Sequence, residues 1–123
     1  MIALVIDDSR AMRSMLSRMV RELGFEVVEA ANGSEALDKL QAGLQPRLAL
    51  VDWNMPQMNG LEFVESVRRD ARLEGVTLMM VTTEIESAQM VRALEAGANE
   101  YLMKPFTREA LVEKLEMLGV ECG

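Results

Sequence analysis

Four short, largely apolar runs in this chain each stop at a polar residue, and this repeated pattern constrains the fold more than any other feature. Short apolar runs separated by helical patterns are typical of buried parallel strands. Because the ligand site of an open α/β sheet lies beyond the carboxyl ends of its strands, the residues after the runs should meet at one edge of one sheet. The runs are residues 1–6, 48–51, 76–81 and 100–103, and the residues that follow them are Asp7 and Asp8, Asp52, Thr82, and Lys104.

The segments between these runs follow helical patterns, so strand and helix alternate five times along the chain. We predict strands over residues 1–6, 25–30, 48–52, 76–82 and 100–103, and helices over residues 10–23, 35–41, 61–69, 85–96 and from 108 onward. Ser9, Ser34 and Thr107 are the predicted N-caps of the first, second and fifth helices. The predicted apolar stripe of the first helix is Met12, Met15, Leu16, Met19, Val20 and Leu23, and the predicted buried seam of the last is Leu111, Leu115 and Leu118.

Five βα units of this length predict an α/β fold, a doubly wound parallel sheet with helices on both faces. The expected topology is the flavodoxin-like (βα)5 arrangement with strand order 2-1-3-4-5. This order places the switch point between the first and third strands. Asp7, Asp8 and Asp52 would meet there.

Length and composition predict a single domain over residues 1–123 without an output domain. The net charge of −7 argues against a nucleic-acid surface, which needs a basic patch. No stretch approaches the roughly 20 apolar residues of a membrane span, and no basic segment precedes the first run as in a signal peptide. We therefore expect no membrane insertion and a cytoplasmic location. The one cysteine, Cys122, fits a reducing compartment, and the absence of histidine excludes an imidazole base and a histidine-ligated metal.

Three carboxylates at one strand edge repel one another. A pair of unit charges about 4 Å apart costs about 4 kcal/mol at an effective dielectric of about 20. A bound divalent cation relieves this repulsion, and a ligand set made only of oxygen atoms favours Mg²⁺. Two alternatives remain open at this point: Asp7 and Asp8 solvate a strand end and help to start a helix, and Asp52 caps a helix or a turn.

Asp52 is the candidate nucleophile, because a carboxylate held beside a metal can attack phosphorus and form an aspartyl phosphate. A transferring phosphoryl group spreads its charge over three equatorial oxygens. One oxygen can bind the metal, one the Thr82 hydroxyl and one the Lys104 ammonium. Taken singly, Thr82 is an ordinary strand residue and Lys104 an ordinary surface lysine. Their joint placement at strand ends favours the phosphoryl site.

These residues, together with the segment Lys104-Pro105-Phe106, resemble the motifs of the response-regulator receiver domain family over essentially the whole chain. The resemblance implies that Asp52 accepts a phosphoryl group from a phosphohistidine on a partner kinase or histidine phosphotransfer domain. It also implies that Asp8, Asp52 and the backbone carbonyl of Asn54 bind Mg²⁺, with Asp7 helping through water. Thr82 and Lys104 would bind the phosphoryl oxygens, the bond before Pro105 would be cis, and Tyr101 would be the aromatic switch residue that responds to Thr82.

The same resemblance implies a signalling switch rather than an enzyme, one that catalyses only its own phosphoryl transfer and dephosphorylation. Its target protein would bind the face built from the fourth helix, fifth strand and fifth helix, and chemotaxis or another motility system is the expected pathway. One departure from the family is Asn59, which stands where Asp is usual before Gly60; we expect a small effect on the loop. Four arginines of the first helix, Arg10, Arg13, Arg18 and Arg21, form either a docking face for the phosphodonor or a solvated surface.

Two rival functions use similar residues. A Mg²⁺-dependent phosphohydrolase of the haloacid-dehalogenase type needs two carboxylates two residues apart after the first strand, but here they are adjacent and position 9 is serine. That class also needs a cap domain. A flavodoxin-like cofactor binder needs a phosphate-cradling loop after the first strand, and none follows it. Both rivals are therefore disfavoured.

Overall fold

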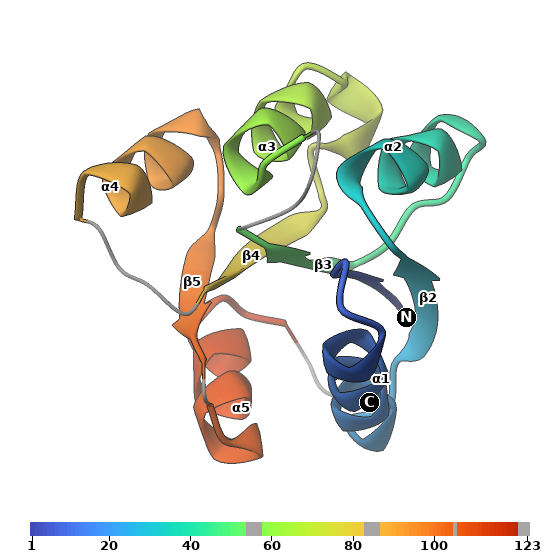
Figure 1. Ribbon diagram of the computed structural model, residues 1–123, viewed down its shortest axis with the longest axis vertical. Coiled ribbons are helices and arrows are strands. Elements are labelled where there is room, and N and C mark those ends of the chain that lie inside the picture. The colour runs from blue at the N-terminus through green and yellow to red at the C-terminus, as the bar shows by residue number, and fades with distance from the viewer. Residues whose placement is uncertain (54–57, 83–86, 105, 121–123) are drawn as a thin grey trace.

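The computed structural model of the chain describes residues 1–53, 58–82, 87–104 and 106–120, and its five strands form one parallel sheet in the order β2-β1-β3-β4-β5 (Figure 1). The strands are β1 (Ile2–Ile6), β2 (Glu26–Ala30), β3 (Leu48–Asp52), β4 (Thr77–Thr82) and β5 (Glu100–Met103). The helices are α1 (Arg10–Glu22), α2 (Gly33–Gln41), α3 (Gly60–Arg68), α4 (Ser87–Ala96) and α5 (Arg108–Met117), with a 3-10 turn η1 (Ala71–Leu73). The predicted flavodoxin-like topology is confirmed.

Helices cover both faces of the sheet and enclose two separate hydrophobic cores (Figure 1). Alternate residues of each strand point to opposite faces, so Leu4 and Ile6 of β1 pack on one core while Ala3 and Val5 pack on the other. The first core is closed by α2, α3 and α4, with Phe63 as its largest fully buried side chain. The second is closed by α1 and α5. Since both faces are covered, β3 and β4 are buried along their whole length.

The helix caps explain where most helices begin. The side chains of Ser9 and Thr107 accept hydrogen bonds from the backbone N–H groups of Met12 and Ala110, as the sequence predicted. The cap of α2 was wrongly predicted: Asn32, not Ser34, accepts the bond from Glu35 N at 2.7 Å. An Asn-Gly pair is a turn signal and a possible helix start, and the sequence alone did not separate the two.

Packing corrects several other predictions. Met15 was placed on the buried stripe of α1 but is 46% exposed, because it lies on the flank of that stripe. In α5 the seam consists of Leu111 and Leu115, whereas Leu118 is the partly buried C-cap and Val120 beyond it is buried. The strands β1, β2 and β4 begin one residue later than predicted, and α2 and α3 begin two residues and one residue earlier. The helices α1 and α3 end one residue earlier than predicted, and η1 was not predicted. The predicted start of α4 at residue 85 lies outside the described residues.

At the amino ends of the strands, the Arg68 side chain of α3 joins three segments of the chain. Its guanidinium donates to the backbone carbonyl oxygens of Gly97 (2.9 Å), Leu73 (3.1 Å) and Val76 (2.8 Å), and to the Asn99 side chain (2.9 Å). Burial lowers the pKa of Arg68, but a guanidinium remains charged at any physiological pH. Arg68 therefore satisfies several carbonyl groups at once and ties α3 to the start of β4 and to the turn before β5.

Candidate metal centre

Three aspartate carboxylates meet at the carboxyl edge of the sheet. Asp7 directly follows β1 and Asp52 ends β3; these strands are neighbours, with Ile6 paired to Val51. One carboxylate oxygen from each of Asp7, Asp8 and Asp52 lies within 4.8 Å of the others. Asp7 and Asp52 are buried, whereas Asp8 is exposed. The prediction that these three carboxylates lie close together is therefore confirmed.

Lys104 brings a positive charge into this cluster. Its Nζ lies 3.3 Å from Asp7 Oδ2 and 3.7 Å from Asp52 Oδ1, and the side chain is only 11% exposed. The residue follows β5, and its backbone N–H donates to the carbonyl oxygen of Thr82 at 2.7 Å. Thr82 is itself buried at the end of β4. Because the ammonium touches two carboxylates, it offsets part of their mutual repulsion in the absence of a metal.

Asp7 is fixed on several sides by contacts that the sequence analysis missed. Its Oδ1 accepts the backbone N–H of Ser9 at 2.9 Å, and its own N–H donates to the carbonyl oxygen of Ala30 at 3.2 Å. A bond from an Asp side chain to the backbone two residues later is an Asx-turn, so the order Asp7-Asp8-Ser9 carried a recognisable signal. The turn explains how the chain leaves β1 and starts α1 while keeping the Asp7 carboxylate in the cluster.

The start of α3 lies tightly against the end of β3, and Gly60 permits this approach. Its N–H donates to the carbonyl oxygen of Trp53 at 3.1 Å. A Cβ at this position would lie 2.5 Å from Met80 Cε and 3.3 Å from the carbonyl oxygen of Asp52. Gly60 is thus a residue of the site region to which the sequence analysis gave no role of its own.

Asn59, the one noted departure from the family, is the N-cap of α3. Its side chain accepts from Glu62 N at 2.9 Å, and the Glu62 side chain accepts from Asn59 N at 3.3 Å. This reciprocal pair is a capping box, which asparagine and aspartate both form. The finding fits the expectation that the departure affects the loop little.

Tyr101, the predicted switch residue, lies on the edge strand β5 and does not join the carboxylate cluster. The Lys114 ammonium of α5 lies 4.7 Å from the centre of its ring, a cation–π contact. Lys114 also pairs with Glu100 at 3.2 Å. The ring is therefore held at the sheet edge, beside α5. Asn54 and Pro105, predicted as a carbonyl ligand and a cis-proline, lie outside the described residues.

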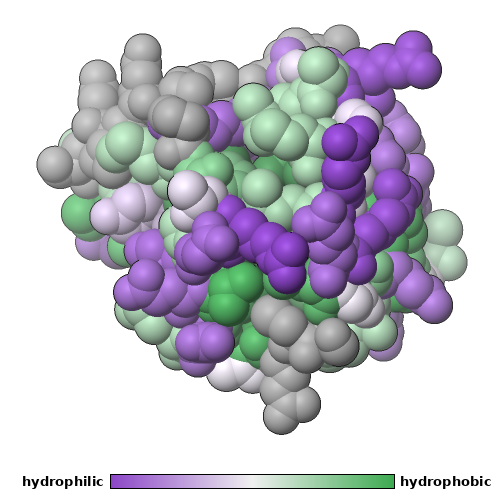
Figure 2. Space-filling model, turned by 90° about the horizontal axis from the view of Figure 1, so that it is seen from below, coloured by the Kyte–Doolittle hydropathy of each residue, from purple (hydrophilic) through white to green (hydrophobic). Residues whose placement is uncertain are grey.

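The face covered by α1 and α5 carries a band of hydrophilic residues with hydrophobic residues on either side (Figure 2). Arg108 of α5 pairs with Glu22 of α1 at 3.4 Å across this face. Of the arginines predicted to point outward, Arg10, Arg18 and Arg21 are exposed. Arg13 differs from them, because its guanidinium is turned inward to the sheet and pairs with Glu29.

The cluster fits a hard divalent cation such as Mg²⁺. Within the part of the chain that the structure describes, its candidate ligands are carboxylate oxygens, which Mg²⁺ prefers, and the chain has no histidine to favour a softer metal. Asp52 and Asp7 are buried, so a cation would be attracted by charges that water screens little. The donor set and the like charge of its members therefore both suit this ion.

Comparison with known proteins identifies the family. The model of the response regulator receiver domain matches residues 3–116, and the chain belongs to that family. It shares 46% identity with the chemotaxis protein CheY1 of Helicobacter pylori over 116 residues, which is 94% of both chains. It shares 45% identity with the chemotaxis protein CheY homolog of Campylobacter jejuni over 122 residues, covering 98% of this chain and 94% of the other.

Solved structures agree with this assignment. The chemotaxis response regulator CheY4 of Vibrio cholerae superposes with a TM-score of 0.87 at 36% identity, over 95% of this chain and 97% of that one. The predicted resemblance to receiver domains is confirmed, and the relatives named above are CheY proteins. The flavodoxin-like order of the strands is also that expected of this family.

Proposed function

We propose that this protein is a response regulator of the CheY type, which accepts a phosphoryl group on Asp52 and thereby changes its affinity for a target protein. The observation that carries the proposal is the cluster of Asp7, Asp8 and Asp52, whose carboxylate oxygens lie within 4.8 Å of one another, with Lys104 in contact with two of them. Full-length similarity to chemotaxis proteins supports a role in chemotaxis or motility and a cytoplasmic location. Among the described helices, none is long and apolar enough to cross a bilayer.

The chemistry follows from the positions of these side chains. An Asp52 carboxylate oxygen attacks the phosphorus of a phosphohistidine on a kinase or a histidine phosphotransfer domain. The new O–P bond forms as the P–N bond breaks, and the imidazole nitrogen keeps the electron pair and takes up a proton. Asp7, Asp8 and Asp52, with the Asn54 carbonyl, are the residues that would hold Mg²⁺, which when bound supplies positive charge beside the phosphoryl oxygens.

Lys104 and Thr82 supply the remaining contacts of the phosphoryl group. The Lys104 ammonium already touches the Asp52 carboxylate at 3.7 Å, so it can bind an oxygen of a group attached there. Thr82 ends β4, the neighbour of β3, with Asp52 paired to Val81. Its hydroxyl is the candidate donor to another phosphoryl oxygen. The protein then acts as a regulator that catalyses only its own phosphorylation and dephosphorylation.

The signal would leave the site through β4 and β5. In the register of these two strands, Thr82 pairs with Met103 and Met80 pairs with Tyr101. A shift of Thr82 toward the phosphoryl group would therefore act directly on β5, the strand that carries Tyr101. The elements α4, β5 and α5 carry four exposed large hydrophobic side chains: Val91 and Leu94 of α4, Met103 of β5 and Met117 of α5. We infer that the target protein binds the surface formed by α4, β5 and α5. Phosphorylation of Asp52 would shift the response regulator between two conformational states that differ in affinity for the target.

Incubation with Mg²⁺ and acetyl phosphate, followed by intact mass measurement, tests the proposal. Wild type should gain one labile phosphoryl group, and Asp52→Asn should gain none. Asp38→Asn is the matched control, because it removes the same charge from an exposed position on α2. Steady multiple-turnover hydrolysis of diverse phosphomonoesters, without a phosphorylated protein, would instead support a phosphohydrolase.

A further inference from the structure

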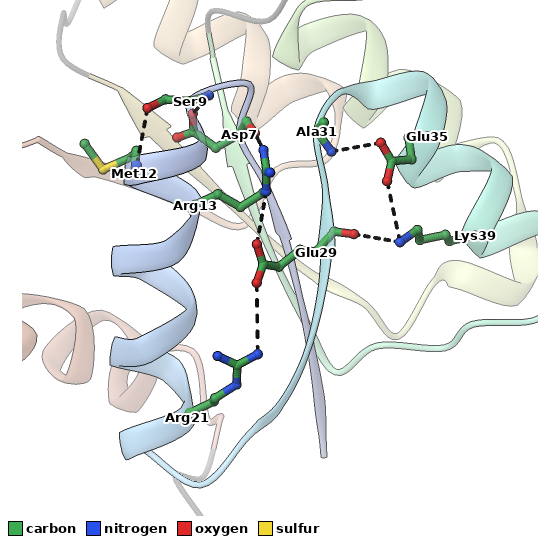
Figure 3. Close-up of polar contacts among 9 residues, drawn as sticks. All are labelled: Asp7, Ser9, Met12, Arg13, Arg21, Glu29, Ala31, Glu35 and Lys39. Atoms are coloured by element: carbon green, nitrogen blue, oxygen red, sulfur yellow. Dashed lines mark hydrogen bonds and ion pairs between the residues drawn. The ribbon is translucent and has the colours of Figure 1, made fainter.

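The Arg13 side chain connects α1, β2 and the turn that carries the two aspartates (Figure 3). Its Nη1 donates to the backbone carbonyl oxygen of Asp7 at 2.8 Å, and its Nε donates to Glu29 Oε1 at 3.0 Å. Only 17% of the Arg13 side chain is exposed. The planar guanidinium presents its donors in a fixed fork, so the two bonds set one orientation of the group.

Glu29 is well placed to hold this fork. Its backbone carbonyl accepts from Lys39 Nζ of α2 at 2.7 Å, and Lys39 also pairs with Glu35 at 3.6 Å (Figure 3). The edge strand β2 is therefore braced from the helix on the other face of the sheet. Arg21 reaches the second Glu29 oxygen only at 4.0 Å and is 57% exposed. Arg13 is the arginine that Glu29 holds closely.

The bond to the Asp7 carbonyl acts on the peptide group between the two aspartates. That group is planar, so fixing its oxygen fixes the orientation from which Asp8 departs. Asp8 is exposed, whereas Asp7 is already bound by Ser9 and Lys104. The position of the Asp8 carboxylate thus depends on the peptide that Arg13 holds.

We propose that Arg13, held by Glu29, is a positioning residue of the metal centre: it orients the Asp7–Asp8 peptide so that Asp8 meets the other two carboxylates. This inference rests on the proposed function, since it assumes that the cluster binds Mg²⁺. Outer-shell partners of metal ligands commonly change metal affinity by about 10–100-fold when they are removed.

The sign of the effect separates positioning from charge. Arg13 is a cation close to a site for another cation, so if it acted only through its charge, removing it would tighten Mg²⁺ binding. If it acts by orienting the peptide, its removal weakens binding. Substitution by methionine keeps an unbranched apolar side chain against the core and removes both donors and the charge.

The experiment is a Mg²⁺ titration followed by the fluorescence of Trp53, the one tryptophan of the chain and the residue after Asp52. We expect Arg13→Met to raise the Kd for Mg²⁺ by about tenfold, the lower end of the outer-shell range. Arg21→Met is the matched control on the same helix, because it removes a Glu29 partner that does not touch Asp7. Its Kd should stay within about twofold of wild type, as for a surface charge screened by salt.

Urea unfolding without Mg²⁺ accompanies each titration, so that affinities are compared under conditions where every variant is folded. If Arg13→Met does not fold, Arg13→Lys replaces it, because lysine keeps the charge but lacks the planar fork of donors. Charge alone then predicts an unchanged Kd, whereas positioning predicts a several-fold rise. An unchanged or lower Kd in Arg13→Met, or an equal rise in Arg21→Met, would overturn the inference. A wild-type protein with no saturable response to Mg²⁺ would instead overturn the proposed function.

Discussion

The two edges of the sheet differ in how their charged side chains are paired. At the amino ends of the strands, one cation, Arg68, is surrounded by the backbone carbonyl oxygens of Leu73, Val76 and Gly97. At the carboxyl ends, three carboxylates lie together, and the Lys104 ammonium contacts two of them, Asp7 and Asp52. The first arrangement satisfies polar groups and stabilises the fold. The second gathers like charges, which costs stability; under the proposed function, this cost prepares a site for a cation and a phosphoryl group.

The largest expected effect is a loss of stability from a substitution at the amino edge of the sheet. Arg68→Ala should lower the free energy of unfolding by about 3 kcal/mol, because it leaves several carbonyl groups without their donor. The Kd for Mg²⁺ should not change, since the carboxylate cluster lies at the other edge. Urea denaturation without Mg²⁺ measures the first quantity and Trp53 fluorescence the second.

The control for this variant is Arg69→Ala, which removes the neighbouring exposed arginine at the C-cap of α3. It should cost less than about 0.5 kcal/mol, as most surface substitutions do. Equal losses in the two variants would show that Arg68 is not the stabilising centre of the amino edge.

On the carboxyl side, Lys104→Gln should slow phosphorylation by acetyl phosphate about 100-fold, because the phosphoryl group loses a preorganised positive charge. The same change should tighten Mg²⁺ binding, since the ammonium and the metal compete for the same carboxylates. Lys114→Gln, which alters an ammonium away from the cluster, is the control for both measurements. Weaker Mg²⁺ binding in Lys104→Gln would contradict the competition.

The carboxyl edge was also the more predictable of the two. Strand ends can be read from where apolar runs stop, so the meeting of Asp7, Asp52, Thr82 and Lys104 at one edge followed from the topology. The Asx-turn at Asp7 and the capping box at Asn59 have local signatures as well, although only the motif residues were used. Functional groups at strand ends leave a pattern in the sequence because the fold aligns them.

The roles of Arg68 and Arg13 could not be predicted in the same way, because both bind backbone carbonyl oxygens. Every residue has a backbone carbonyl, so the sequence does not mark which one an arginine will bind. The Gly97 carbonyl that Arg68 binds lies 29 positions away in the chain. The sequence analysis grouped Arg13 with the three other arginines of α1 on its outward side. The structure turns it inward because Glu29 of the neighbouring strand attracts it.

A smaller effect should follow from relieving the repulsion at the carboxyl edge. Without Mg²⁺, Asp8→Asn should raise the free energy of unfolding by about 1 kcal/mol, because one of three neighbouring negative charges is removed. In wild type, Mg²⁺ should add stability in proportion to the logarithm of its concentration above Kd, and the variant should lose this gain. Asp38→Asn, an exposed change on α2, should show neither effect. Destabilisation by Asp8→Asn in the absence of metal would mean that the cluster is not under repulsion.

The smallest effect concerns an exposed pair at the amino edge, Asp70 and Arg72. Hydrogen bonds from the Arg72 side chain and backbone hold the pKa of the Asp70 carboxyl below its usual range. Its contribution to stability is present above the unfolded pKa and lost as the pH falls through the lowered folded pKa. In Arg72→Gln the pKa should return only part of the way, since the backbone donor remains; a carboxyl NMR titration measures this. Because the pair is in solvent, its loss should change stability far less than the loss of Arg68. A larger loss would mean that the amino edge owes its stability to surface ion pairs rather than to carbonyl groups bound by one arginine.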